Sequence, residues 1–203
     1  ANTLTVTVWE AAANSLRTAG LAAALAVLIG SLVALVLSRR PTARAGRRAI
    51  SLMDALFMLP LGVSAVTVGF GFLVTLDRPL GLPVDLRTAG LLVPIAQAVV
   101  AVPLVVRVLL PVLRAIDPRQ RQAAATLGAS PWRVLRAIDG RVAARPLGLA
   151  VGFAFAVSLG EFGATSFLAR PDTATLPVVV FRLIGRPGEQ NLGMALAASV
   201  LLA

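Results

Sequence analysis

The chain has 203 residues, of which 58% are hydrophobic and 14% are charged, whereas soluble domains carry roughly 25% charged residues, so the composition is that of a membrane protein. All 19 basic residues are arginine and the net charge is +10, a balance that would indicate a nucleic-acid partner only in a soluble protein. Because cysteine and histidine are absent, the sequence excludes disulfides, thiol nucleophiles and the usual zinc or general-base sites, and it predicts no enzyme, metal or cofactor.

Apolar stretches of about 20 residues, the length that crosses a hydrocarbon core of roughly 30 Å, recur along the chain. They predict an all-α membrane protein, a polytopic bundle of at least five transmembrane helices in a single domain over residues 1–203. The predicted spans lie near residues 18–38, 52–76, 89–113, 147–168 and 192–203. Because the sequence starts at Ala and stops within an apolar run, we expect a piece of a longer polypeptide, truncated at both ends.

The arginines predict the orientation of these spans. The loops after the first and third spans together carry 12 of the 19 arginines. By the positive-inside rule both loops are cytoplasmic. The N-terminal segment and the loops after the second and fourth spans are then outside, and the chain is expected to be a multi-pass protein of a bacterial inner membrane.

The loop at residues 114–146 contains signals for two short helices. Asp117-Pro118 is typical of a helix start, and Gly128 is suited to end that helix in a left-handed turn. Ser130-Pro131 repeats the start signal. The second helix carries one apolar stripe, with Asp139 and the arginines on its other side. The stripe consists of Trp132, Leu135, Ile138 and Val142.

Three other interpretations deserve weight. Ala-rich helices also occur as connectors without a partner. Residues 123–138 have the spacing of a DNA-binding helix-turn-helix, but such a motif needs a third helix and its own core, and this loop returns to the membrane at Arg145-Pro146, so we predict no nucleic-acid partner. A channel or secondary transporter would carry internal inverted repeats, and none is evident in the sequence.

The spacing Gln122-Ala123-Ala124, three residues, Gly128, nine residues, Ile138 resembles the EAA loop of the permease subunits of binding-protein-dependent ABC importers. In that family the loop forms coupling helices that dock in a cleft of an ATP-hydrolysing subunit. Tryptophan and arginine, the residue types of interface hot spots, follow the turn. The predicted coupling residues are Gln122, Ala123, Ala124, Gly128, Trp132, Arg133 and Ile138. The chain departs from the family pattern at Gln122, which replaces Glu, and at Gly140-Arg141, which replaces Leu-Pro.

Residues 158–169 (SLGEFGATSFLA) and 175–202 resemble the permeases for ferric iron and thiamine, and the core at 160–164 is also similar to that of sulfate and molybdate permeases. The resemblance implies the membrane component of an ATP-driven importer for ferric iron or thiamine, with sulfate or molybdate as the alternative. It also implies a cytoplasmic ATP-binding subunit, an external solute-binding protein and a second permease half. Ferric iron and thiamine permeases are commonly two fused halves, and this chain would be the C-terminal one.

Glu161 is a carboxylate well inside the fourth predicted span, in its outer half. A charge there costs about 2.5 kcal/mol or more unless it faces water or a partner, which favours a functional role. We predict a gate on the pathway, in which glycines let the helix bend or pack closely and a serine one turn away is a hydrogen-bond neighbour. The predicted gate residues are Glu161, Ser158, Gly160 and Gly163.

Overall fold

The computed structural model describes residues 6–39, 41, 43–76 and 90–202, and every regular element in these ranges is helical. The all-α prediction is thus confirmed. The longer helices are α1 (Val8–Leu37), α2 (Arg44–Gly62), α3 (Ala65–Thr75), α4 (Leu92–Ala115), α7 (Gly140–Leu159) and α10 (Glu189–Leu202). The shorter elements are α5 (Pro118–Thr126), α6 (Pro131–Val134), the π-helical segment η3 (Leu135–Asp139), α8 (Thr165–Leu168), the 3-10 turn η4 (Pro171–Thr173) and α9 (Leu176–Ile184).

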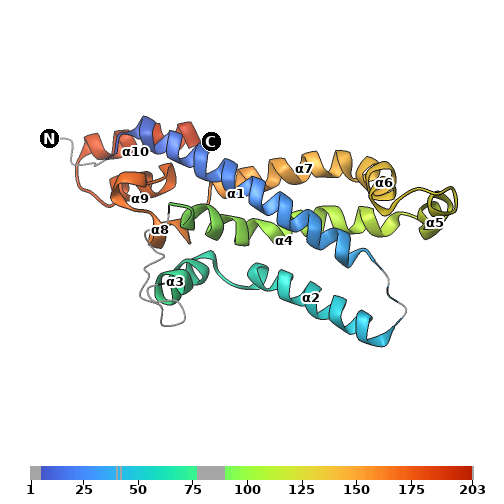
Figure 1. Cartoon of the computed structure of the whole chain (residues 1–203). Coiled ribbons are helices and arrows are strands. Elements are labelled where there is room, and N and C mark those ends of the chain that lie inside the picture. Colours follow the sequence, from blue (N-terminus) through green and yellow to red (C-terminus); the bar gives the residue numbers. More distant parts are fainter. Residues whose placement is uncertain (1–5, 40, 42, 77–89, 203) are drawn as a thin grey trace.

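Three helices form the centre of the molecule. Helices α1, α4 and α7 run side by side along its length and pack extensively against one another (Figure 1). Each belongs to a helix that is long and apolar enough to cross a membrane, and for α7 this helix is Pro131–Leu159, in which α6, η3 and α7 are continuous. The main cluster of buried apolar side chains lies between these three helices.

Helix α1 approaches α4 closely because one of its faces carries small residues. Ala22, Ala26, Gly30 and Ala34 recur every four residues and are all buried. A Cβ atom added at Gly30 would lie 2.7 Å from the Cβ of Val105 on α4, which is too close for two carbons. In lipid the hydrophobic effect does not drive helices to associate, because lipid tails are as apolar as the side chains. Close van der Waals packing therefore holds α1 and α4 together.

Helix α1 begins at Val8, well before the predicted start at residue 18. Its start is fixed by a capping box between Thr7 and Glu10. The Thr7 hydroxyl accepts the Glu10 N–H at 3.3 Å, and the Glu10 carboxylate accepts the Thr7 N–H at 2.7 Å. Two N–H groups that have no partner inside the helix are thereby satisfied, and α1 extends beyond its most apolar part.

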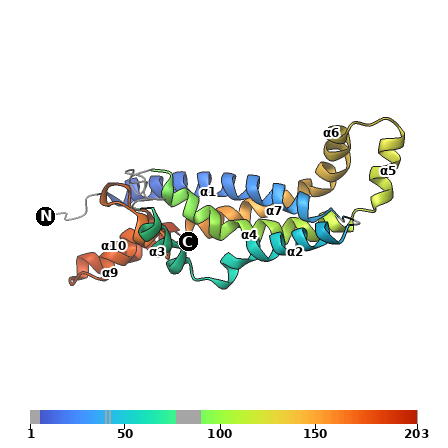
Figure 2. The ribbon, with the colours of Figure 1, turned by 60° about the horizontal axis from the view of Figure 1, so that its bottom comes forward.

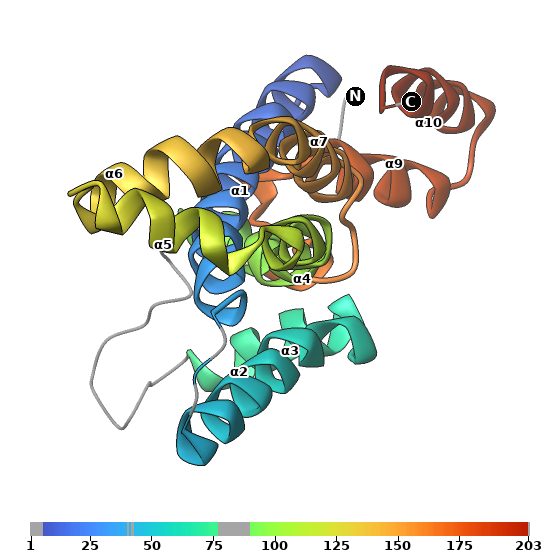
Figure 3. The ribbon, with the colours of Figure 1, turned by 90° about the vertical axis from the view of Figure 1, so that its right-hand side faces the viewer.

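The predicted span near residues 52–76 is broken. Helix α2 ends at Gly62, and the axis of α3 is bent away from it by 103°. Pro60 removes an N–H from the last turn of α2, and Ser64 starts α3 by accepting the Val66 N–H at 3.3 Å. Figure 3 shows α2 and α3 as an arm beside α1 and α4. By length and composition the described residues therefore contain three spans, or four if this bent pair is one span.

Helices α9 and α10 lie beside the N-terminal part of α1. The Ser15 hydroxyl on α1 accepts the Leu176 N–H at the start of α9 at 2.7 Å. Helix α10 covers most of the fifth predicted span. These helices and α8 gather at one end of the bundle, whereas α5 and α6 project beyond the other end (Figure 2).

The two ends of the bundle are expected to face opposite sides of the membrane. The end with α5 and α6 carries the arginine-rich loops, so the positive-inside rule predicts that it is cytoplasmic. The end with α8 and α9 is then predicted to be outside. The predicted outer loop at residues 77–88 lies outside the described residues.

This orientation can be tested with single cysteines, because the chain has none of its own. Asp172 on η4 and Ser130 at the start of α6 are both exposed, at opposite ends. In intact cells an impermeant maleimide should label Asp172→Cys and should label Ser130→Cys only after the membrane is permeabilised. Labelling of Ser130→Cys from outside would reverse the orientation.

Candidate functional site

The cytoplasmic loop folds as the two helices that its sequence predicts. Asp117 caps α5 by accepting the Arg119 N–H at 2.9 Å, and Ser130 caps α6 by accepting the Arg133 N–H at 3.4 Å. A proline follows each cap. A backbone N–H at this position has no partner inside the helix, so proline can stand there without loss of a helical hydrogen bond. Between the helices Gly128 has φ +78°, the predicted left-handed conformation, and no other atom within 4 Å of an added Cβ.

The loop presents large apolar side chains to its surroundings. Leu127 at the turn is 88% exposed and Trp132 on α6 is 69% exposed. The other predicted coupling side chains are exposed or half-buried, namely Gln122, Ala123, Ala124, Arg133 and Ile138. A groove of about 420 Å³ with a mixed polar and apolar lining lies beside α6 and η3, lined by Ser130, Trp132, Arg133, Arg136, Ala137 and Arg141. The loop therefore combines exposed apolar groups with positive charge.

Asp139 is buried, contrary to the prediction that it lies on the polar face of the second helix. Its side chain is 1% exposed and bonds to Arg121 and Arg39, whereas Trp132 and Val142 of the predicted stripe are exposed. The helix changes to π geometry over Leu135–Asp139, and the wider turn rotates the following residues away from the α-helical register. The apolar stripe is thus interrupted, and a carboxylate points inward.

The second helix of the loop is continuous with the membrane-spanning helix α7. It continues from Pro131 through Pro146 to Leu159 without a break, so the chain makes no turn at Arg145-Pro146, the predicted point of return to the membrane. A helix-turn-helix reader of DNA has no such continuation into a bilayer.

Glu161 lies after the end of α7 rather than inside a helix. Helix α7 ends at Leu159, and the chain turns before α8 begins at Thr165. The Glu161 carboxylate accepts the N–H of Ala164 at 2.7 Å and the N–H and hydroxyl of Thr165 at 3.0 and 2.6 Å. It therefore satisfies the backbone groups that the break leaves without helical partners.

Two polar residues beside Glu161, namely Gln97 and Thr165, were not among the predicted site residues. Gln97 on α4 is buried and donates from Nε2 to the Thr165 hydroxyl at 3.2 Å, so a chain of hydrogen bonds joins α4 to the break. The Gln97 Oε1 atom has no protein partner in the described part of the chain. The same holds for the Ser158 hydroxyl, so the predicted bond between Ser158 and Glu161 is not formed. A glutamine in the middle of an apolar stretch was the available signal for this network.

The glycines near the break allow close packing of α3. A Cβ atom at Gly163 would lie 3.0 Å from the Cβ of Ala65, and one at Gly69 would lie 2.5 Å from the Cα of Ala164. Gly160, in contrast, ends α7 with φ −84° and meets nothing closer than 3.7 Å. Gly163 and Gly69 therefore let the arm touch the backbone that Glu161 holds.

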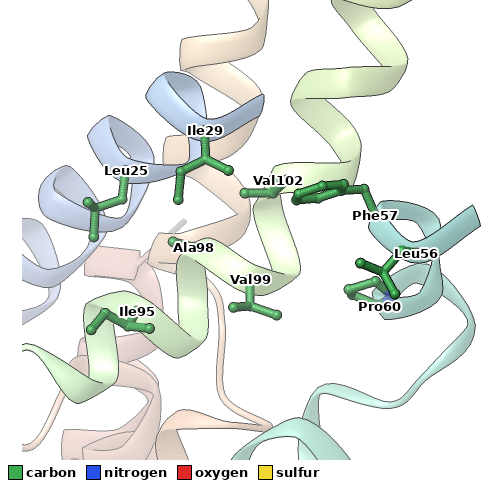
Figure 4. A pocket seen from close by; sticks show the side chains of 9 residues that line it. All are labelled: Leu25, Ile29, Leu56, Phe57, Pro60, Ile95, Ala98, Val99 and Val102. Atoms are coloured by element: carbon green, nitrogen blue, oxygen red, sulfur yellow. The ribbon is translucent and has the colours of Figure 1, made fainter. Parts of the chain in front are cut away.

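An apolar cavity of about 330 Å³ separates part of the arm from the bundle. Figure 4 shows its lining side chains, which come from α1, α2 and α4. They are Leu25, Ile29, Leu56, Phe57, Pro60, Ile95, Ala98, Val99 and Val102. A wall that is almost entirely apolar offers little to bind a charged cargo. Among the described residues no group of three His, Cys, Asp or Glu could hold a metal ion.

Long apolar helices, an arginine-rich end and a two-helix loop define a multi-pass membrane protein. The chain belongs to the family of binding-protein-dependent transport system inner membrane components, whose sequence profile matches residues 26–203. This confirms the resemblance read from the EAA-like spacing.

The relatives of this chain within the family are named for different solutes. The chain is 31% identical over 194 residues to the thiamine transport system permease of Escherichia coli strain K12, which covers 96% of this chain and 35% of the relative. It is 34% identical over 201 residues to the molybdenum transport system permease of the same strain, with coverage of 90% and 82%. The molybdenum permease of Haemophilus influenzae is 36% identical over 166 residues, covering 74% and 72%. The chain thus spans about a third of the thiamine permeases that it matches.

Replacing Gly128 by Val should loosen the loop. A β-branched residue in the left-handed region costs roughly 1–2 kcal/mol or more, which favours opening of the turn about 5- to 30-fold. We expect trypsin to cleave the loop arginines correspondingly faster in purified Gly128→Val. In Gly148→Val, on α7 with open space around it, the cleavage rate should stay unchanged. Equal rates in the two variants would contradict the left-handed turn.

Replacing Gly69 by Ala should separate α3 from the break. The added methyl would overlap the Ala164 backbone, and overpacking of this kind costs about 1–3 kcal/mol. We expect the free energy of unfolding in mixed micelles to fall by that amount. Gly71→Ala on the same helix meets nothing within 4 Å and should lose no stability, since alanine is the better helix former by about 0.5–1 kcal/mol. If both variants unfold alike, the close contact is absent.

Proposed function

We propose that this chain is the membrane-spanning component of an ATP-driven importer, coupled through α5 and α6 to a separate ATP-hydrolysing subunit. One observation carries the proposal: Leu127 and Trp132, 88% and 69% exposed, stand at the cytoplasmic loop outside the apolar bundle. Large apolar side chains displayed together in water mark a protein interface. The chain itself then hydrolyses nothing.

The residues around these two side chains support docking against a folded partner. Gln122, Ala123 and Ala124 lie on one short helix, where small side chains let a partner's backbone come close. Trp132 supplies a rigid apolar anchor, and Arg133 beside it supplies charge; both types are enriched at interface hot spots. Gly128 sets the angle between the two helices, and Ile138 packs the second helix against the bundle. Closure of the ATPase subunits would thereby move α6 and, through the continuous helix, α7.

At the other end we propose that the break after α7 is the external gate. The Glu161 carboxylate accepts from three donors of Ala164 and Thr165, which supports a role in holding the break rather than in binding cargo. Gly160 ends α7, Gly163 lets α3 lie against the break, and Ser158 is buried one turn before it. A movement of α7 would thus reach the packing of α3 against α8.

Thiamine is the solute that we propose first, delivered by an external solute-binding protein. The thiamine permease relative matches 96% of this chain, and the sequence resembles that branch around residues 158–169. Molybdate is the second candidate, because the molybdenum permease is matched over 82% of its own length. Ferric iron, expected from the same resemblance, has no such support among these relatives. Since the chain spans about a third of the thiamine permeases, we propose that a second half completes the pathway.

Uptake by the complete importer in proteoliposomes tests the proposal. When ATP and the solute-binding protein are supplied, labelled thiamine should accumulate in the proteoliposomes. Accumulation of molybdate instead of thiamine would support the second candidate. Trp132→Ala should weaken binding of the ATPase subunit roughly 30-fold, the loss typical of a hot-spot tryptophan. Trp9→Ala, which removes a tryptophan 74% exposed at the opposite end, should leave that affinity unchanged. ATP-independent accumulation would contradict the proposal.

A further inference from the structure

Asp139 is a buried carboxylate for which the docking surface gives no role. It lies at the end of η3, between Trp132 and the membrane-spanning part of α7. Its Oδ2 accepts a hydrogen bond from Nη2 of Arg39 at 3.0 Å, and its Oδ1 accepts one from Nε of Arg121 at 2.9 Å. Nη2 of Arg121 also pairs with Oδ1. One carboxylate therefore joins η3 to α5 and to the chain just after α1.

Arg121 and a further arginine, Arg114, reach the ends of two bundle helices. Arg121 donates to the carbonyl oxygen of Leu113, near the end of α4, at 3.4 Å. Arg114 on α4 donates to the carbonyl oxygen of Leu37, the last residue of α1, at 3.5 Å. Carbonyls at a helix C-terminus lack helical partners and favour cations. These groups close a ring, the Asp139 junction, which consists of Asp139, Arg39, Arg121, Arg114 and the carbonyls of Leu37 and Leu113.

We propose that Asp139 is a positioning residue that makes the coupling loop and the cytoplasmic ends of α1 and α4 move as one rigid body. The inference rests on the proposed coupling function and assigns it a mechanism. Through the junction, a displacement of α6 is delivered to three bundle helices together, to α7 along the helix and to α1 and α4 through the two arginines.

The location in the π-helical segment explains why such a residue is needed. A π turn departs from regular α-helical bonding and is a common site of local bending. Without a lateral bond, α6 could swing about Leu135–Asp139 and leave α7 in place. Two arginines from different elements hold the end of this segment from two sides. Apolar packing of equal volume could stabilise the fold as well, but a buried ion pair accepts only one arrangement of its partners.

The first test measures solute taken up per ATP hydrolysed by the complete importer. Asp139→Asn should lower this ratio roughly tenfold, within the range of coupling between distant sites, while ATPase-subunit binding stays as in the wild type. Asp139→Glu should recover part of the ratio. Arg121→Gln should lower it too, and the double variant should be no worse than either single one, because one interaction is lost in all three. Arg119→Gln, which removes the same charge from an exposed site on α5, should leave it unchanged.

The second test measures the proposed rigidity directly and does not depend on a buried substitution. Spin labels on cysteines at Arg119 on α5 and at Val36 on α1, both exposed, report the distance across the junction. The distribution of distances between the two labels should be the same without nucleotide and with trapped ATP. It should broaden in Arg39→Gln, a substitution at a side chain that is 46% exposed. A shift of the distance between the two nucleotide states of the wild type would overturn the proposal.

The two proposals fail separately. If the wild-type importer shows no ATP-driven uptake, the proposed function is wrong. If the wild type transports and both Asp139→Asn and Arg121→Gln keep its ratio of uptake to ATP hydrolysis, the function stands and the Asp139 junction has no part in coupling.

Discussion

Lipid cannot bond to a backbone N–H or C=O group, so every break in a membrane helix must be satisfied by the protein itself. This constraint accounts for the placement of three polar side chains near the ends of helices. Ser64 satisfies the start of α3, Glu161 the turn before α8, and Arg121 a carbonyl at the end of α4. The breaks are also where the helices can change direction relative to one another, which makes them the natural positions for a gate and for coupling.

Helix α4 connects the two ends of the molecule. At its outer end Gln97 bonds to Thr165, which shares the Glu161 carboxylate with the break. At its cytoplasmic end the Leu113 carbonyl accepts from Arg121, which pairs with Asp139. Between these points α4 is packed against the small-residue face of α1 and against α7. A helix held at both ends and closely packed along its length can transmit displacement without deforming, because packed interiors yield little.

Local signals in the sequence were enough to predict the parts of the structure that depend on neighbouring residues. The caps Asp117 and Ser130 and the turn at Gly128 were read correctly, whereas the orientation from arginine counts stays a prediction. The start of α1 was placed too late, although Thr7 and Glu10 carry the capping-box spacing that marks it.

The features that depend on tertiary contacts could not be read from the sequence. Burial of Asp139 follows from a π turn, and helical periodicity assumes that no such turn exists. Glu161 was placed inside a helix because hydropathy continues past Gly160, whereas the chain breaks there and is held by α3 and α4. In both cases the misplaced residue is a carboxylate that bonds to groups distant in sequence or across a break, which hydrophobic periodicity does not report.

The central claim is that α5 and α6 dock on an ATP-hydrolysing subunit. Site-specific photocrosslinking in native membranes tests it most directly, with the photoreactive group at Leu127 and a control at Trp9, 88% and 74% exposed at opposite ends of the molecule. The account predicts that Leu127 forms a crosslink to the ATPase subunit and that Trp9 does not. A Leu127 probe that reacts only with lipid, or an ATPase crosslink from Trp9, would contradict it.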